Sequence, residues 1–281
     1  MTGAARGLGK AIAKELAARG VKVAALGLEE DALSEVASEL PTASRWWGVD
    51  ITDDVAMARV AEEGSRGMGP VSIVIANAGV AESGPFLGSD EGSWRRVIEI
   101  NLIGSAVTAR SFMPQLTRAR DHYLQIASLA SVGAVPMLSA YCASKAGVEA
   151  FAHSLRGEMA PHGVGVTIAC LNWIDTDMIR DADRYAVMRK VRSSMPRPAR
   201  TTRSPDHMAH RVGASVERRA PSVYVPGWLW GSQIVRAGFP VAITRLSRRK
   251  LTHSRYSATG LLGAGGRAAH SAGESGAASD R

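Results

Sequence analysis

Cysteine is scarce in this chain, with only Cys142 and Cys170 among 281 residues. A scaffold held by disulfides is therefore excluded, and two thiols in a chain of this size are typical of a reducing compartment, so we expect a cytoplasmic protein. No run of ~18 uncharged apolar residues occurs, which excludes a membrane-spanning helix. The histidines and cysteines are scattered, and no metal site is predicted.

Acidic residues become scarce in the last third of the chain. Residues 1–188 contain 17 Lys/Arg and 22 Asp/Glu, a net charge of −5, whereas residues 189–281 contain 17 Lys/Arg and 4 Asp/Glu, a net charge of +13. The overall +8 therefore gives no reason to expect that the main body binds nucleic acid. Because 46% of the residues are apolar and 21% are charged, a buried core is expected and disorder throughout is excluded.

Short apolar runs alternate with helical patterns over the first 175 residues. The predicted strands are Val21–Leu26, Val71–Ala76, His122–Ala127 and Val164–Leu171. The predicted helices are Leu8–Arg19, Asp31–Leu40, Asp53–Arg66, Trp94–Leu116 and Ser139–Ala160. Continuous apolar strands alternating with helices indicate an α/β fold with a doubly wound parallel sheet, buried on both faces.

The pattern degrades after about residue 195. The proline-rich stretch Met195–Pro205 is predicted to be a loop, and Ser222–Val225 one more strand, at the edge of the sheet. We expect a main domain over residues 1–226, with a substrate lid at about 177–203. A basic and apolar cap over 227–251 and a disordered tail over 252–281 would follow.

Glycines cluster at the beginning of the first predicted helix, in the sequence Thr2-Gly3-Ala4-Ala5-Arg6-Gly7-Leu8-Gly9. Glycines at this spacing allow a tight turn and the close approach of a pyrophosphate to a helix N-terminus. Taken alone, such a triplet is equally compatible with an ordinary turn.

The strand that should precede this loop is missing from the printed sequence. In a doubly wound sheet that strand is central, and here only Met1 comes before the loop. Without it, the neighbouring strands lose a hydrogen-bonding partner in the core. We therefore expect a truncated first strand, with further strand residues upstream of the printed start.

Tyr141 and Lys145 lie four residues apart, on one face of a predicted helix. An ammonium group close to a phenol lowers the pKa of the phenol and suits it to acid–base chemistry near pH 7. That spacing alone is more often a solvated helix face. Ser128 favours the chemical interpretation, because it follows a predicted strand thirteen residues upstream, where its hydroxyl can face the crevice.

Together these residues resemble the short-chain dehydrogenase/reductase family. The glycine loop, Asn77-Ala78-Gly79, Asn101, Ser128, Tyr141 and Lys145 occur in the order and spacing of that family, over roughly residues 2–178. The resemblance implies a Rossmann fold and an NAD(P)-dependent oxidoreductase that acts on a small-molecule alcohol or carbonyl. It also implies a homo-oligomer, since members often associate through the helices here placed at Trp94–Leu116 and Ser139–Ala160.

The same resemblance implies a role for each matching residue. Tyr141 would be the general acid/base, and Lys145 would lower the pKa of Tyr141 and bind the nicotinamide ribose. Ser128 would bond the substrate oxygen, and Asn101 would hold a water of the proton relay. The cofactor would be bound by Thr2, Gly3, Arg6, Gly7, Leu8, Gly9, Asp50, Asn77, Ala78, Gly79, Tyr141, Lys145 and Thr176.

Two positions depart from the family pattern. Asn172-Trp173 replaces the usual Pro-Gly after the sixth strand of the family, which puts the backbone path beside the nicotinamide in question. Gly27 stands where NAD-preferring members usually have an Asp for the ribose 2′-hydroxyl. With Arg6 nearby this slightly favours NADP, but Glu29 and Glu30 act against a 2′-phosphate, so NAD remains open.

The lid and the basic end allow alternatives. Met178, Ile179, Tyr185, Val187, Met188 and Met195 either line an apolar substrate pocket or simply pack the lid. The segment from Trp228 to Arg255 is a solvated helical cap, a peripheral membrane contact or, least favoured, a nucleic-acid binder. The competing function is therefore a non-catalytic nucleotide-binding protein, or a membrane-associated one that acts through its basic end.

Overall fold

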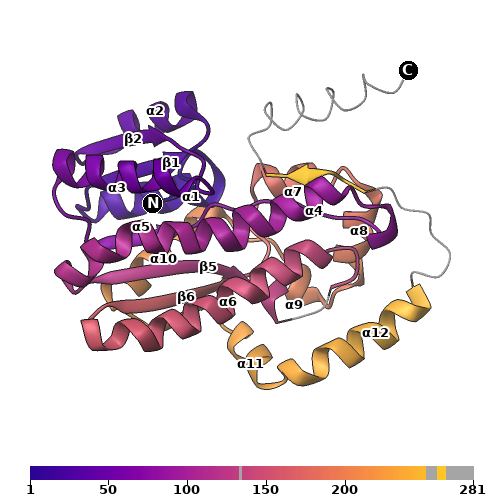
Figure 1. Cartoon of the computed structure of the whole chain (residues 1–281). Helices are drawn as coiled ribbons and strands as arrows, with labels where there is room; N and C mark the ends of the chain where they lie inside the picture. Colours follow the sequence, from indigo (N-terminus) through magenta and orange to yellow (C-terminus); the bar gives the residue numbers. More distant parts are fainter. Residues whose placement is uncertain (133–134, 251–257, 264–281) are drawn as a thin grey trace, which may run out of the picture.

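The computed structural model describes residues 1–132, 135–250 and 258–263, with backbone alone for residues 246–250. Parallel strands run through the centre of the molecule, and helices cover both of their faces (Figure 1). This arrangement confirms the doubly wound α/β fold.

Three sheets are formed by the described strands. They are β1 (Val23–Gly27), β2 (Ser44–Gly48), β3 (Ile73–Ala76), β4 (Ala81–Glu82), β5 (His122–Ser128), β6 (Gly165–Leu171), β7 (Ser222–Val225) and β8 (Leu261–Leu262). The order β3-β5-β6-β7 gives a four-stranded parallel sheet, and β1-β2 is a parallel pair. The pair β4-β8 is antiparallel.

The two parallel sheets meet at Met1 and Thr2, not through a strand ladder. The backbone N–H of Thr2 donates to Ile75 O at 3.0 Å, and Leu26 N–H donates to Met1 O at 2.9 Å. These two residues thus lie between β1 and β3, the place where the sequence predicted a truncated central strand. Within the described residues, β1 and β3 are joined only through them.

The helices divide between the two faces. They are α1 (Gly7–Ala18), α2 (Glu30–Glu39), α3 (Asp54–Met68), α4 (Glu91–Ile98), α5 (Gly104–Ala119), α6 (Ser139–Met159), α7 (Asp177–Ala182), α8 (Ala186–Ser194), α9 (Arg197–Arg200), α10 (Pro205–Glu217), α11 (Leu229–Ile234) and α12 (Phe239–Lys250). Helices α1, α2 and α10 bury their apolar residues in one core, and α3, α5 and α6 bury theirs in another on the opposite face. None of the described helices is both long enough and apolar enough to cross a bilayer.

Local sequence explains where several helices begin. The side chain of Asp53 accepts a hydrogen bond from Ala56 N–H at 2.9 Å and caps α3, and Ser204 caps α10 in the same way through His207 N–H. Such caps satisfy backbone donors that have no partner within the helix. Strand β5 forms because its residues up to Ala127 are all buried, as expected for a central parallel strand.

The structure confirms the predicted strands to within two residues at each end and departs from the predictions elsewhere. Strand β2 and helix α10 were not predicted. The single helix expected over Trp94–Leu116 is interrupted between α4 and α5 by a π-helical turn, η2 (Glu99–Ile103). The loop expected at Met195–Pro205 contains the short helix α9.

The last correction concerns the tail. Residues 252–281 were expected to have no structure, yet β8 lies within them and pairs with β4. The strand forms because Leu262 finds a buried position beside a partner far upstream. The other parts of that prediction, residues 252–257 and 264–281, lie outside the described residues.

Candidate active site

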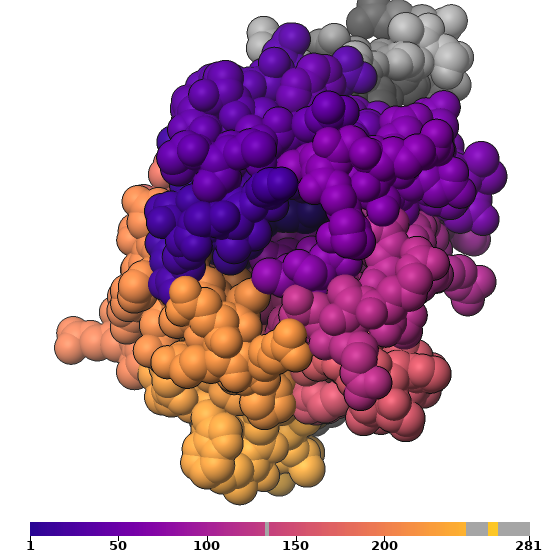
Figure 2. All heavy atoms as spheres, turned by 90° about the vertical axis from the view of Figure 1, so that its left-hand side faces the viewer, coloured from indigo at the N-terminus to yellow at the C-terminus, as the bar shows by residue number. Residues whose placement is uncertain are grey.

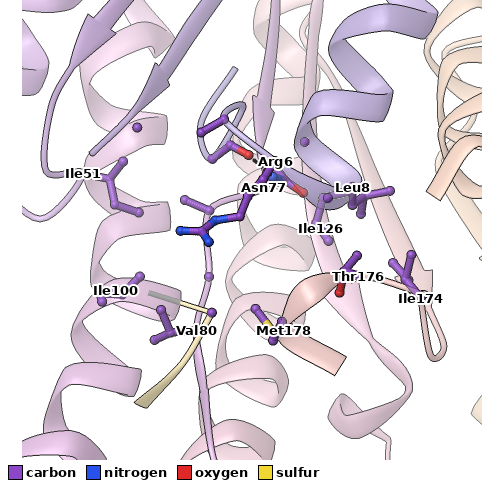
Figure 3. A pocket seen from close by; sticks show the side chains of 18 of the residues that line it. Arg6, Leu8, Ile51, Asn77, Val80, Ile100, Ile126, Ile174, Thr176 and Met178 are labelled. Atoms are coloured by element: carbon purple, nitrogen blue, oxygen red, sulfur yellow. Dashed lines mark hydrogen bonds between the residues drawn. The ribbon is translucent and has the colours of Figure 1, made fainter. Parts of the chain in front are cut away.

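A pocket opens where the carboxyl ends of β1, β3, β5 and β6 meet the beginning of α1. Figure 2 shows the hollow on this face, beside the indigo N-terminal residues, and Figure 3 shows the side chains around it. Its lining includes the glycine loop, Asn77–Gly79, Ser128, Tyr141, Lys145 and Thr176. Segments far apart in the chain therefore converge on one crevice, as expected at the strand ends of a doubly wound sheet.

The glycine positions of the loop leave no room for side chains. Gly3 and Gly7 have φ angles of +64° and +51°, which L-residues rarely adopt. A Cβ atom at position 9 would lie 1.8 Å from the carbonyl oxygen of Gly3. The loop therefore keeps its backbone exposed to the pocket at the N-terminus of α1, where amide groups favour an anion.

Thr2 and Asn77 lock this loop to the end of β3. The hydroxyl oxygen of Thr2 accepts from Asn77 N–H at 3.0 Å and from Ala78 N–H at 3.1 Å. In return, Asn77 Nδ2 donates to the carbonyl oxygens of Thr2 and Gly3, both at 3.1 Å. Thr2 is buried and does not line the pocket, so its observed part is to hold the loop; Asn77 and Ala78 do line the pocket.

Asn101 acts as a clamp behind the site. Its Oδ1 accepts from Val80 N–H at 2.8 Å, and its Nδ2 donates to Val80 O and to Ser144 Oγ, both at 2.9 Å. The side chain thus joins the segment after β3 to helix α6. A Cβ atom at Gly79 would lie 3.0 Å from Asn101 Oδ1, so a side chain there would displace the amide group of Asn101. The water-holding role of Asn101 stays a prediction.

Ser128, Tyr141 and Lys145 come together at the floor of the pocket. Ser128 ends β5, and its Oγ accepts from Ala130 N–H at 3.1 Å. The ammonium group of Lys145 is 5.8 Å from the centre of the Tyr141 ring, and it donates to Ile126 O at 3.4 Å. Lys145 is only 5% exposed. The triad predicted from the sequence is therefore assembled in space.

The protonation of this triad differs from the sequence-based expectation. Burial raises the pKa of Tyr141, and a hydrogen bond with Ser128 offsets this only in part. Lys145 was expected to lower the pKa of Tyr141, but burial lowers the pKa of Lys145 itself to about 8. The ammonium group of Lys145 lies over the face of the Tyr141 ring. Burial therefore dominates the pKa of Tyr141 in this structure.

An arginine clamp connects the two elements that carry the triad. Arg236 donates to Ser131 O at 2.7 Å, just after Ser128, and lies 3.2 Å from Glu149 Oε1, one turn after Lys145. Glu149 is buried on α6. The cap segment that follows β7 thus holds the Ser128 loop against the helix that bears Tyr141.

Charged side chains gather at the opposite end of the pocket. Arg6 forms an ion pair with Glu29, directly after Gly27 and Leu28, and all four line the pocket. Asp50 also lines it. Burial acts to raise the pKa of Asp50, but hydrogen bonds from Thr52 and the nearby Arg96 outweigh it and hold that pKa below its usual range.

Asn172-Trp173 stands where the family usually has Pro-Gly, and the backbone after it is held by regular hydrogen bonds. Arg203 N–H donates to Trp173 O at 3.0 Å, and Asp175 N–H donates to Arg203 O at 2.9 Å. This pairing directs the chain into α7, where Thr176 reaches the pocket. A Cβ atom at Gly7 would lie 3.1 Å from Thr176 Cγ2, so the glycine loop and α7 are in close contact.

An apolar cluster, here called the lid cluster, lies beside Tyr141. Its buried members are Ala81, Leu138, Ala182, Val187, Met188, Val191 and Leu262, with the half-buried Val135, Met137, Tyr141, Cys142, Trp173, Met178 and Met195 packed against them. Of the lid residues singled out in the sequence, Met178 lines the pocket and Val187 and Met188 pack inside. Ile179 is half-buried outside the cluster, and Tyr185 is exposed.

Sequence reasoning missed several pocket residues. Ile51, Val80, Ile100, Ile126 and Ile174 add an apolar lining (Figure 3). Their position directly after or near the ends of predicted elements is a signal that could have identified some of them. Arg96 and Gly263 also line the pocket, and no local pattern marks them.

The residues present fit a dinucleotide. A side chain at Gly3 or Gly9 would collide with the backbone, so the loop keeps this shape only with glycine there, and its backbone lines the pocket at the start of α1, where a pyrophosphate would lie. The charged end at Arg6, Glu29 and Asp50 offers donors and acceptors for a ribose, and the triad lies at the other end of the same pocket.

Comparison with known proteins gives a consistent result. A family model described as short chain dehydrogenase matches residues 1–185. The dehydrogenase/reductase SDR family member 7B of Bos taurus is 30% identical over 239 residues, which are 79% of this chain and 71% of the bovine protein. The 3-oxoacyl-[acyl-carrier-protein] reductase FabG of Escherichia coli is 29% identical over 195 residues, covering 68% of this chain and 80% of FabG.

Other similar proteins differ in length or were found by structure. The probable oxidoreductase EphD of Mycobacterium tuberculosis is 30% identical over 191 residues, and the chain spans about a third of it, 32%. The KRED1-Pglu enzyme has a TM-score of 0.69 and 27% identity, covering 78% of this chain and 93% of that enzyme. A short chain dehydrogenase from Mycobacterium paratuberculosis bound to NAD has a TM-score of 0.71 and 24% identity over 80% of this chain and 94% of its own, a likeness of fold.

Proposed function

The chain belongs to the short-chain dehydrogenase family of oxidoreductases acting on CH–OH and C=O groups, and from this premise we propose that it interconverts an alcohol and a carbonyl with NAD(P), using Tyr141 as general acid/base. The observation that carries the proposal is the convergence of Ser128, Tyr141 and Lys145 on the pocket that the glycine loop also lines. One crevice therefore offers a dinucleotide cradle and a proton donor.

In this proposal each group of the triad has one task. A nicotinamide, when bound, would supply the hydride to the carbonyl carbon or accept it in the reverse direction. The hydroxyl of Tyr141 donates its proton to the carbonyl oxygen, and Ser128 Oγ donates a hydrogen bond to the same oxygen. Lys145 stabilises the phenolate left on Tyr141 by its charge. Proton and hydride together convert C=O to CH–OH.

The resting state of Tyr141 is the protonated phenol, which is the form that donates a proton when a carbonyl is reduced. A buried phenol keeps its proton at neutral pH, so it is ready to donate. Lys145, whose pKa is about 8, still carries its proton at pH 7 and can balance the phenolate once that forms.

We propose NADP(H) as the preferred form of the cofactor. Gly27 removes the carboxylate that would repel a 2′-phosphate, and the guanidinium group of Arg6 lies at that end of the pocket. The ion pair between Arg6 and Glu29 works against this preference, because Glu29 neutralises the charge that a phosphate would need. Parallel titrations with NADH and NADPH measure the outcome of this competition.

Tyr141→Phe tests the function. We expect turnover of a carbonyl panel with NADPH or NADH to fall by about 10²- to 10⁴-fold, the usual contribution of a positioned acid or base, with nucleotide binding retained. Tyr224→Phe, a half-buried tyrosine in β7, is the matched control. Turnover that survives in Tyr141→Phe at the level of the control would refute the role of Tyr141.

A further inference from the structure

Large apolar side chains are exposed on the segment that follows β7. Among the described residues twelve large apolar side chains are exposed, and five of them fall within residues 228–241. These five, here called the cap face, are Trp228, Trp230, Ile234, Val235 and Val241. The other seven are spread over residues 28–185. Single exposed apolar side chains are common on soluble proteins, whereas a group of them marks a surface that meets a partner.

Helix α11 turns one side to the body of the molecule and the other to solvent. Leu229 is fully buried, whereas Trp230 and Ile234, four residues apart on the outer side, are 62% and 70% exposed. The segment is fixed from within, because Arg236 donates to Ser131 O at 2.7 Å and lies 3.2 Å from Glu149 Oε1. The cap face is therefore the outer side of a firmly attached segment.

Helix α12 continues this segment at the edge of the molecule. In both views the orange and yellow residues of α11 and α12 form the lower edge (Figures 1 and 2). Among the described elements, α12 packs mainly against the short turn η5 (Arg236–Gly238). A helix of twelve residues is marginal in water when little packs against it. A further surface that covers α12 would stabilise it.

The charge of this segment has one sign. Residues 228–250 contain five Lys/Arg and no Asp or Glu. Arg245 is exposed one turn after Val241, on the same side of α12. Apolar side chains next to cations are typical of helices that lie in the interface of an anionic bilayer, where tryptophan rings settle at the level of the headgroups.

We propose that the cap face docks on the surface of an anionic phospholipid bilayer. The cations of α12 attract the headgroups, and the apolar side chains of the cap face enter the boundary of the acyl chains. A second copy that met this face across a two-fold axis would oppose cations with cations. Duplex phosphates would pair with the cations but would leave Trp230 and Ile234 without an apolar partner.

Co-sedimentation of the full chain with vesicles of phosphatidylglycerol and phosphatidylcholine in equal parts tests this docking. Trp230→Ala/Ile234→Ala should lower the partition coefficient at least about tenfold, because two large apolar side chains leave the interface. The matched control, Trp46→Ala/Val55→Ala, removes a comparable exposed pair from β2 and α3 and should bind as the unmodified chain does. Thermal melting of both double variants establishes that they remain folded.

The contribution of charge is measured with the unmodified chain. Vesicles of phosphatidylcholine alone should bind it at least about tenfold less, since they offer no net negative charge. Raising the NaCl concentration from about 0.1 M to about 1 M shortens the Debye length from ~10 Å to ~3 Å and should weaken binding to the anionic vesicles. Binding that ignores both changes would contradict a role for the cations.

Brominated acyl chains locate the contact, because they quench the fluorescence of a tryptophan that enters the bilayer. Trp228→Phe/Trp230→Phe keeps aromatic apolar groups at both positions, so this variant should still bind the anionic vesicles but lose most of the quenching. Quenching that persists in this variant would come from tryptophans elsewhere in the chain and would overturn the proposal.

The remaining outcomes distinguish the other partners. Absence of vesicle binding by the unmodified chain, or an equal loss in the two alanine double variants, would overturn the proposal. Self-association that Trp230→Ala/Ile234→Ala abolishes, without vesicle binding, would assign the cap face to a second copy. Binding of a DNA duplex in place of vesicles would assign the basic segment to nucleic acid. None of these results concerns the kinetics of Tyr141→Phe, which test the proposed function on their own.

Discussion

The two ends of the pocket are built in opposite ways. The cofactor end depends on backbone geometry and amide hydrogen bonds between Thr2, Gly3 and Asn77, segments that short motifs mark in the sequence. The lid end depends on apolar packing among segments from Ala81 to Leu262. The first arrangement requires particular residues at particular positions, and the second requires apolar volume. We expect the two ends to differ in their tolerance of substitution.

Gly9→Ala should have the largest effect. Its Cβ atom would lie 1.8 Å from the carbonyl oxygen of Gly3, and a backbone atom cannot move aside as the end of a flexible side chain can. We expect NADPH affinity to fall by more than about a hundredfold, because the cradle at the N-terminus of α1 must deform. Fluorescence titration with NADPH measures this.

The control for that change is Gly157→Ala, in α6, where an added Cβ would meet nothing within 4 Å. It should bind NADPH as the unmodified protein does. Equal NADPH affinity of the Gly9→Ala and Gly157→Ala proteins would contradict the claim that the cofactor end requires particular residues at particular positions.

Lys145→Met changes a buried residue of the triad. We expect it to raise the free energy of unfolding although it removes a functional group. Below pH 8 the folded protein holds a buried ammonium, a cost of roughly 3 kcal/mol that follows from the lowering of the pKa of Lys145 from 10.5 to about 8. The free energy of unfolding should therefore be higher for Lys145→Met at pH 7. Turnover should nevertheless be lost.

The pH dependence provides the check on that prediction. Between pH 8 and 10.5 the unfolded chain binds the proton of Lys145 more tightly than the folded one, so the cost fades as pH rises through this interval. Urea unfolding of both proteins without nucleotide should show their stabilities converging from pH 7 toward pH 10. A Lys145→Met protein that is less stable at pH 7 would contradict the assignment.

Met178→Leu, at the lid end, should have the smallest effect. The two side chains have similar volumes, and swaps of this kind in apolar clusters usually cost less than about 1.5 kcal/mol. Because Met178 contributes apolar surface and no hydrogen bond, we expect kcat/KM for a carbonyl substrate to change less than about threefold. A tenfold loss of kcat/KM in steady-state assays would mean that the lid end tolerates substitution as poorly as the cofactor end.

The sequence predicted the cofactor end and the triad because motif residues there follow buried strands closely. Strand β2 was missed because Arg45, Trp46 and Gly48 are exposed, so no apolar run marks it. Strand β8 was missed for a different reason. Its two-residue ladder depends on Ala81 and Glu82, far away along the chain, and no local pattern encodes such a pairing.

The sequence indicated which residues lie at or near the site, but not the hydrogen bonds and pKa values that they have there. Asn77 lines the pocket whereas Thr2 and Asn101 do not, and the structure shows all three bonding to other parts of the protein. The pKa of Tyr141 could not be predicted from a spacing of four residues, because burial outweighs the nearby ammonium group. Burial is a property of the assembled fold.

The number of residues in the π-helical turn η2 determines where the side chain of Asn101 lies relative to the site. Helix α4 and helix α5 continue each other through Glu99–Ile103, where the backbone accommodates one residue more than an α-helical turn does. Deleting a single residue there would close the wide turn to α-helical geometry and change which side chain occupies the position of Asn101. Asn101 would then no longer face Val80 and Ser144 together. In evolutionary terms, this stretch is expected to accept changes of identity more readily than changes of length.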